Sequence, residues 1–576
     1  MILKIKFYIT NEKMRKYLFL LFLMLTTTVS AQNSITLTGQ VIDDLKEPLI
    51  GVSVSVKGTT NGTSTDIAGT FVLNNVPSNS TIVVSMIGFD QQEIALKGQT
   101  ELNVILKEKA TTLDDVVVIG YGVVKKSDLT SSITTVKGEK LQDMSAGNAL
   151  NALQGKANGV QITSAGGPGD VPRIIIRGVT TQNGSDPLYV VDGVPLPEGS
   201  NINYINQHDI ESMEILKDAS AAAIYGTRGS NGVVLISTKK GKVGKPTFQF
   251  SSSVGFQTMK KPNIAGAEVY EKVFKTRFEN DGSSWENAWG TKTGNGLKNS
   301  DGTDWWDKTV NDYALQHNYN FGFQGGSEQI VYSGSVGYFR QESQFDAGYW
   351  QRLTGRFNTE YKFSPVVKFG MDFNPAYENW EDTPNLFGAA MKMDPTTPVY
   401  RSKDEWSTTN SYNNYERSYH NLEHNPVATA ARQNAYTNKY ALGMNPYVNI
   451  EPLKGLIFRT QFGVNVSNEI YNKFTPIFFI DNLEKNDKAS AERKSTTRVN
   501  WAWTNTVNYM KTFDEKHNIN LMGGYTMEKD AIYWNRSETT DIASNHPDLQ
   551  YPNAGSTRIA AEGTDEFYTL ISYIGR

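Results

Sequence analysis

Residues 496–510 read TTRVNWAWTNTVNYM, a stretch in which apolar side chains alternate with polar or small ones. Successive residues of a β-strand point to opposite faces, so this pattern gives the strand one apolar face and one polar face. The apolar set is Val499, Trp501, Trp503, Val507 and Tyr509, and the opposing set is Asn500, Ala502, Thr504, Thr506 and Asn508. Strands of about ten residues with this alternation are typical of transmembrane β-barrels.

The same alternation predicts ten strands in the C-terminal part of the chain. They are 246–257, 315–324, 329–339, 352–363, 366–374, 445–453, 455–467, 496–510, 516–526 and 567–574. Short turns such as Ser364-Pro365 alternate with long connections such as 258–314 and 375–444. This asymmetry is typical of outer-membrane barrels, whereas a soluble β-sandwich, the alternative for the same period, has no need of it. We expect residues 242–576 to form the first part of a large transmembrane β-barrel.

Composition restricts the remaining classes of function. Lys and Arg total 56 against 60 Asp and Glu, a net charge of −4, which argues against binding of nucleic acid. The chain has no cysteine, which excludes thiolate catalysis, thiolate metal sites and disulfides. No Ser-His-Asp set or carboxylate pair stands out, so we predict neither an enzyme nor a cofactor. His420 and His424 are four residues apart but lack the HExxH arrangement, and we predict no metal site.

Two segments precede the barrel-like region. Residues 1–31 have a basic start, an apolar run and small residues before Gln32, which together predict a cleaved secretory signal peptide. Residues 32–108 alternate in short runs such as Val52, Val54 and Val56, separated by turn residues, and are predicted to form a small β-sandwich. Residues 109–122 form a linker that ends in a short apolar strand, and such a strand suits pairing with another chain, although it could equally belong to a neighbouring sheet.

Residues 123–241 are predicted to form a compact α+β domain. Asp192-Gly193 lies between short apolar runs and suits a type I′ hairpin turn. Arg173, Arg177 and Arg228 could bind an anionic ligand, but we favour pairing of these side chains with acidic groups on a polar barrel wall.

Specific stretches carry a family resemblance. Residues 39–77 resemble the carboxypeptidase-regulatory-like β-sandwich. DDVVVIGYG resembles the TonB box of SusC/RagA-type TonB-dependent receptors of the outer membrane. RIIIRGVTTQNGSDPLYVVDGVPL (173–196) and INQHDIESMEILKDASAAAIYGTRGSNGVVLISTKKG (205–241) resemble the plug domain of that family.

The resemblance implies an active importer of oligomeric nutrients, glycans more than peptides, in the outer membrane of a Gram-negative bacterium. It implies as partners TonB with ExbB and ExbD, a SusD-like surface lipoprotein, and outer-membrane lipid. The TonB-binding residues are then Asp114, Asp115, Val116, Val117, Val118, Ile119, Gly120, Tyr121 and Gly122. The matching plug-motif residues are Arg173, Arg177, Gly178, Asp192, Gly193, Arg228 and Gly229.

Tryptophans in the predicted loops are candidates for contact with an oligosaccharide or peptide ligand, although they could equally pack the loops. The candidates are Trp305, Trp306, Trp380 and Trp406. DGTDWWD (301–307) resembles a TDWxD element of these transporters, and Asp301, Asp304 and Asp307 offer oxygen ligands without the full spacing of a Ca²⁺ loop.

Length suggests that the chain is part of a larger protein. Family barrels with a plug have about 22 strands, and a ring of ten has a radius of roughly 10 Å, too small for a plug with a radius of gyration of about 13 Å. We therefore expect a fragment of an importer. The alternatives are a surface receptor or adhesin anchored by a barrel, and a non-functional fragment; a secreted peptidase lacks a catalytic set.

Overall fold

The computed structural model describes residues 34–576 except 44–46, 87–88, 108–115, 120–121, 126–132, 143–146, 165, 180–183, 198, 219–221, 285–301, 383, 385, 408–410 and 514–516. The predicted signal peptide therefore lies outside the described residues. The chain divides into two compact units, residues 1–116 with 125–128, and residues 117–124 with 129–576.

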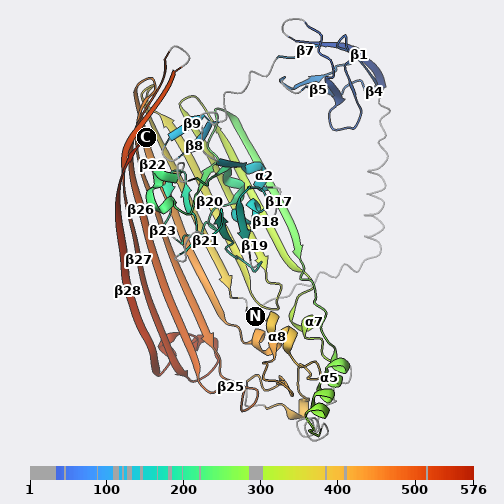
Figure 1. Cartoon of the computed structure of the whole chain (residues 1–576), viewed down its shortest axis with the longest axis vertical. Helices are drawn as coiled ribbons and strands as arrows, with labels where there is room; N and C mark the ends of the chain where they lie inside the picture. Colours follow the sequence, from blue (N-terminus) through green and yellow to red (C-terminus); the bar gives the residue numbers. More distant parts are fainter. Residues whose placement is uncertain are drawn as a thin grey trace, which may run out of the picture. The chain divides into compact units, whose positions relative to one another are not determined.

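The first unit is a small β domain made of two sheets (Figure 1). One sheet has the order β4-β1-β7 and the other β3-β2-β5-β6. The alternating valines point inward, and Val52, Val54 and Val56 are all buried. The strands are β1 (Ser34–Ile42), β2 (Ser53–Val56), β3 (Gly62–Ser64), β4 (Thr70–Pro77), β5 (Thr81–Ser85), β6 (Gln92–Ala95) and β7 (Glu101–Ile105).

The second unit is dominated by an antiparallel sheet of ten strands in sequence order, which we call the wall. Its strands are β17 (Gly244–Gln257), β18 (Ala314–Gly326), β19 (Ile330–Glu342), β20 (Tyr349–Lys362), β21 (Val367–Glu381), β22 (Ala435–Leu453), β23 (Leu456–Thr475), β26 (Ala489–Phe513), β27 (His517–Ile542) and β28 (Thr557–Gly575). All ten predicted strands are therefore present. Most strands extend further into the long connections than predicted, by 16 residues at the end of β27, whereas β17 ends at Gln257 as predicted.

The wall is polar where it is buried and apolar where it is exposed. On β23, Phe458 and Phe462 are 41% and 43% exposed, while Gln461, on the other face, is 4% exposed. Asn318, Asn358 and Asn500 are likewise almost fully buried. A soluble sandwich buries its apolar face, so this reversed pattern is that of a barrel wall with its apolar face toward lipid.

A smaller domain, the plug, lies against the polar face of the wall (Figure 1). Its main sheet has the order β10-β15-β16-β13-β14, and β11 pairs with β12. The elements are β10 (Ile133–Lys137), α2 (Gly138–Gln142), α3 (Ala149–Leu153), β11 (Val160–Thr163), β12 (Arg173–Ile176), β13 (Leu188–Val191), β14 (Val194–Pro195), η2 (Gln207–Asp209), β15 (Ile210–Leu216), η3 (Ala223–Gly229) and β16 (Val233–Thr238).

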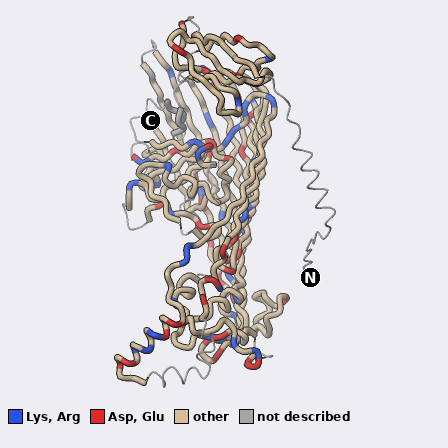
Figure 2. The backbone as a smooth tube through the Cα atoms, turned by 90° about the vertical axis from the view of Figure 1, so that its right-hand side faces the viewer, with Lys and Arg blue, Asp and Glu red and all other residues tan. Residues whose placement is uncertain are grey.

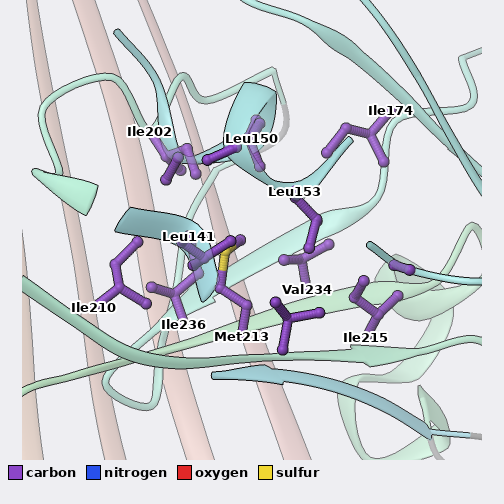
Figure 3. Packing of buried hydrophobic residues seen from close by; sticks show 14 of the residues in the cluster. Leu141, Leu150, Leu153, Ile174, Ile202, Ile210, Met213, Ile215, Val234 and Ile236 are labelled. Atoms are coloured by element: carbon purple, nitrogen blue, oxygen red, sulfur yellow. The ribbon is translucent and has the colours of Figure 1, made fainter. Parts of the chain in front are cut away.

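The plug has its own hydrophobic core, as expected of a domain that folds against a polar wall. Leu141, Leu150 and Leu153 from the helices meet Met213 and Val234 from the sheet (Figure 3). All five are buried in one cluster. The α+β fold predicted for this region is therefore present.

The long connections of the wall carry short elements. They are α5 (Ala267–Asn280), α7 (Trp305–Thr309), α8 (Phe387–Lys392), η4 (Lys403–Glu405), α9 (Pro426–Ala431), β24 (Phe478–Phe479), β25 (Lys485–Asn486), η5 (Pro547–Leu549) and η6 (Pro552–Ala554). Acidic and basic residues are mixed along α5 (Figure 2), in line with the small net charge. In the described parts of the chain no helix is long and apolar enough to cross a membrane.

Candidate functional site

The Asp192-Gly193 turn is one of the points where the plug meets the wall. Both residues have positive φ, 47° and 84°, as a type I′ turn requires, so the predicted hairpin is confirmed. The carbonyl oxygen of Asp192 accepts hydrogen bonds from Gln461 Nε2 at 2.9 Å and Asn445 Nδ2 at 3.3 Å, both on the wall. The Asp192 carboxylate accepts from the backbone N–H of Thr238 at 2.9 Å, which fixes the turn to β16.

Arg352 of β20 holds a second part of the plug. Its guanidinium donates to the carbonyl oxygens of Gly147 (3.3 Å), Ile205 (3.4 Å) and Asn203. The residue is 3% exposed. A buried guanidinium satisfied by backbone carbonyls fixes the path of the chain, because carbonyl positions depend on backbone conformation.

Arg356 lies four residues after Arg352 on the same face of β20, and it holds a third part of the plug. It donates to the carbonyl oxygen of Lys239 and to the hydroxyl of Thr238, both at the end of β16. It also forms an ion pair with Asp372 of β21 at 3.1 Å, and both side chains are at most 5% exposed. Asn358 Nδ2 donates to the same carboxylate at 2.8 Å, whereas Arg356 Nε is buried without a hydrogen-bond partner among the described residues.

The three plug arginines do not all behave as predicted. Arg228 pairs with Glu528 of the wall and also donates to the carbonyl oxygen of Leu196, as expected. Arg177 instead pairs with Asp218, and Arg173 donates to Ser185 Oγ at 2.9 Å. Both contacts therefore stay within the plug. Arg177 has a positive φ of 58° directly after β12, and its partner Asp218 lies in the connection between β15 and η3.

Two glycines of the plug motif are required for different reasons, one for its backbone conformation and one for a close approach. Gly178 has a φ of 95°, a conformation that side chains rarely adopt. A Cβ on Gly229 would lie 2.8 Å from the carbonyl oxygen of Ala222, so only glycine fits this approach.

Two titratable plug residues lie beside the arginines of the wall. Burial, with the nearby charges of Lys239 and Arg352, lowers the pKa of His208 to about 4, so its imidazole is neutral at pH 7. Burial raises the pKa of the adjacent Asp209 carboxyl, and the charge of Arg356 opposes this rise. Neither residue was singled out from sequence, because their burial depends on the wall.

The predicted TonB box is described only in part. Asp114, Asp115, Gly120 and Tyr121 lie outside the described residues. The backbone of Val116–Ile119 forms β8, which pairs with β9 (Gly122–Lys125) in a two-stranded sheet. The extended backbone agrees with the predicted strand, and binding of TonB at residues 114–122 stays a prediction.

The tryptophan candidates have different environments. Trp305 and Trp306 are 3% and 4% exposed, and Trp305 Nε1 donates to the carbonyl oxygen of Asp394 at 2.8 Å. Both rings therefore pack the loop rather than face a ligand. Trp380 is half-buried within β21, not in a loop, because the strand runs to Glu381. Trp406 is 43% exposed and is the candidate with an accessible ring.

The carboxylates near Trp305 are occupied by a lysine. Asp304 caps the start of α7, and Lys261 Nζ pairs with Asp304 and with Asp307, the latter at 2.8 Å. These hydrogen bonds raise the pKa of Lys261 above its usual range. The Lys261 ammonium thus lies between the two carboxylates, and Asp301 lies outside the described residues, so Ca²⁺ binding by these aspartates stays a prediction.

His420 and His424 lie beside different carboxylates. The segment around them is irregular, His420 Nε2 lies 4.0 Å from Asp394, and His424 Nδ1 lies 3.1 Å from Glu484. Within the described residues, no group of three or more His, Asp or Glu side chains is placed to hold a metal ion.

Comparison with known proteins places these features in a family. The CarboxypepD_reg-like domain matches residues 37–118, and the TonB-dependent Receptor Plug Domain matches residues 125–233. The TonB-dependent receptor P39 of Formosa agariphila is 30% identical over 570 residues, which cover 98% of this chain and 52% of the relative. The TonB-dependent receptor SusC of Bacteroides thetaiotaomicron is 37% identical over 391 residues, 66% of this chain and 37% of SusC.

A solved structure shares the fold. The RagAB peptide importer in its open-open state superposes with a TM-score of 0.68 at 24% identity, over 80% of this chain and 54% of that one. The chain spans about half the length of the relatives that it matches. These relatives are receptors and transporters rather than enzymes. The chain thus combines a CarboxypepD_reg-like domain with a TonB-dependent receptor plug domain, and along nearly its whole length it is similar to TonB-dependent receptors such as P39 and SusC, which are outer-membrane proteins of Gram-negative bacteria.

Proposed function

We propose that the protein is a TonB-dependent importer that brings an oligomeric nutrient, a glycan rather than a peptide, across the outer membrane. The observation that supports this proposal is the docking of a separately folded plug on the polar face of the wall. A barrel that only anchored surface loops would have no need of a plug, or of a strand-forming segment directly before it.

The contacts between plug and wall suit a domain that must be displaced and then return. They include hydrogen bonds made by wall side chains to the backbone carbonyls of Asp192, Asn203 and Lys239. Hydrogen bonds exchange with water at a small net free energy each, about 0.5–1.5 kcal/mol between neutral groups and about 1.5–3 kcal/mol where a guanidinium donates, whereas a large apolar interface would resist separation. A pulling force on the N-terminal side of the plug can therefore break them in turn.

The proposed source of that force is TonB, energised by ExbB and ExbD. TonB would pair by its backbone with residues 114–122, using an edge of β8 that has no partner among the described strands. A SusD-like lipoprotein would close over the long loops, where Trp406 offers an exposed ring for a sugar.

Uptake is expected to require the proton gradient. Cells that carry the full-length protein would be given fluorescently labelled oligosaccharides and peptides, with and without a protonophore. We expect internal fluorescence only with the gradient intact, while surface labelling on ice is unchanged by the protonophore, because binding needs no force. Uptake that continues with the gradient collapsed would contradict import driven by TonB. Binding with no uptake in either condition would favour the receptor or adhesin.

A further inference from the structure

A cavity of about 370 Å³ lies between the plug and the wall. On the wall side it is lined by residues near the ends of β17, β18 and β19, at the edge of the wall where the long connection 258–313 joins β17 to β18, so it lies on the side of the long loops. Carboxamide side chains are the most frequent polar groups of the lining, four from the plug and three from the wall. They are Asn148, Asn151, Gln154 and Asn203 on the plug, and Gln257, Gln316 and Gln341 on the wall.

Three of the plug amides, Asn148, Asn151 and Gln154, come from α3 and the residues next to it, and the fourth, Asn203, accepts a hydrogen bond from Asn148 Nδ2. The three are spaced three residues apart, which places side chains on one face of a helix. The other face carries Leu150 and Leu153, which point into the plug core (Figure 3). The sequence NALNALQ therefore separates a leucine face from an amide face, and the core contact of the leucines fixes the amides toward the cavity.

The wall amides belong to three neighbouring strands and are linked. Gln341 Nε2 donates to Gln257 Oε1, and Gln257 Nε2 donates to Gln316 Oε1, both at 3.1 Å. Gln316 and Gln341 are 6% and 7% exposed, so their amides are held in place within a largely buried row. A site on rigid elements with linked side chains is ordered before a ligand arrives.

The charge of the lining restricts the ligand. None of the residues that line the cavity in the described part of the chain is Lys or Arg. The one carboxylate, Asp170, accepts hydrogen bonds from Ser164 Oγ at 2.6 Å and from the backbone N–H of Gly166 at 3.3 Å. An acidic ligand would lose water here without gaining a cation, at a cost of several kcal/mol.

We propose that this amide cavity is a binding site for an uncharged, hydroxyl-rich ligand, a neutral saccharide unit. A carboxamide offers one acceptor and two donors side by side, which suits hydroxyl groups that both donate and accept. Its volume lies within the range of about 300–1,000 Å³ that is usual for small-ligand sites. The inference rests on the proposed import function, whose cargo it narrows to neutral glycans, and it assigns to the plug a direct part in recognition.

The test is a binding titration with the purified full-length protein in detergent. The probes are neutral oligosaccharides of glucose, mannose, xylose, galactose and fructose, acidic oligosaccharides of galacturonate and of sulfated galactose, and a mixture of short peptides. We expect neutral probes to bind the wild type. Asn151→Leu and Gln341→Leu should each weaken that binding about tenfold, since each loses the equivalent of one or two hydrogen bonds.

Gln351→Leu is the matched control, because Gln351 follows Trp350 on β20 and so faces away from the cavity. Asn151→Asp, nearly the same shape, keeps the test valid if a leucine variant fails to fold, and it should also weaken binding of neutral probes. The proposal is overturned if only acidic or peptide probes bind, if no probe binds, or if the cavity variants match the control. TonB is absent from this binding assay. A negative binding result would therefore overturn the saccharide site but not the proposed import function, which the proton-gradient experiment tests on its own.

Discussion

Deletion of residues 114–122 is expected to reduce uptake to the level of cells that lack the protein, while binding of the ligand at the cell surface is retained. The segment lies before the plug and outside the ten-stranded wall, so we expect the plug to stay docked without it. Pairing with TonB through the backbone would be lost entirely, because such pairing needs a continuous extended strand. Uptake and binding of the same labelled oligosaccharide would be measured in parallel.

Two variants separate loss of the strand from a change in linker length. Replacement of residues 114–122 by a Gly-Ser segment of equal length should abolish uptake as the deletion does. Val118→Pro removes a backbone donor and should lower uptake strongly, whereas Val118→Ala keeps the backbone and should have a smaller effect. Wild-type uptake by the Gly-Ser variant would show that force does not enter the protein here.

The strands of the wall could be predicted because one face must be apolar along the whole membrane thickness. Beyond the lipid that requirement ends, and the pattern fades while the hydrogen-bonded ladder continues. Strand β22 begins at Ala435, ten residues before the predicted start, and the stretch AYTNKYALGM has too little alternation to mark it. The same loss of pattern hid the end of β21, and so Trp380 was assigned to a loop.

Contacts between plug and wall were much less accessible to sequence reasoning. Arg352 donates to the carbonyl of Asn203, 149 positions away, and backbone carbonyls carry no residue-specific signal. One signal was present: Arg352, Thr354, Arg356 and Asn358 form the polar face of a strand whose other face carries Leu353 and Phe357. Charged residues on the inward face of a barrel strand indicate a partner inside, although not which one.

The environments of the loop tryptophans could not be predicted from local sequence. Whether a ring packs or faces solvent depends on how the long connections fold on one another, as when Trp305 reaches the carbonyl of Asp394 in the next long connection. Local sequence is the same in either case, so Trp305, Trp306 and Trp406 could not be distinguished before the structure was known.

Substitution of Arg356 by Met is expected to destabilise the docked plug by about 3–5 kcal/mol, the usual result of breaking a buried ion pair from one side. Asp372 would lose its ion-pair partner while remaining buried, and Thr238 and the carbonyl of Lys239 would lose their donor. The readout is hydrogen exchange of the β16 amides, Val233–Thr238, in the full-length protein. We expect faster exchange there, with the amides of the wall strands far from β20 unchanged.

The double variant Arg356→Met with Asp372→Leu tests the reason for this loss. If the cost comes from an unpaired buried carboxylate, removal of that carboxylate should recover much of the lost protection, because apolar replacements of buried pairs are often neutral. Arg340→Met is the matched control. Arg340 and Glu342 are both on β19, the strand next to β20, and form an ion pair at 2.7 Å. Because both side chains are partly exposed, we expect loss of this pair to cost less than about 1 kcal/mol. Equal exchange in the Arg356 and Arg340 variants would mean that Arg356 does not anchor the plug. Faster exchange that the Asp372 change does not reverse would instead assign the anchoring to the hydrogen bonds with Thr238 and Lys239.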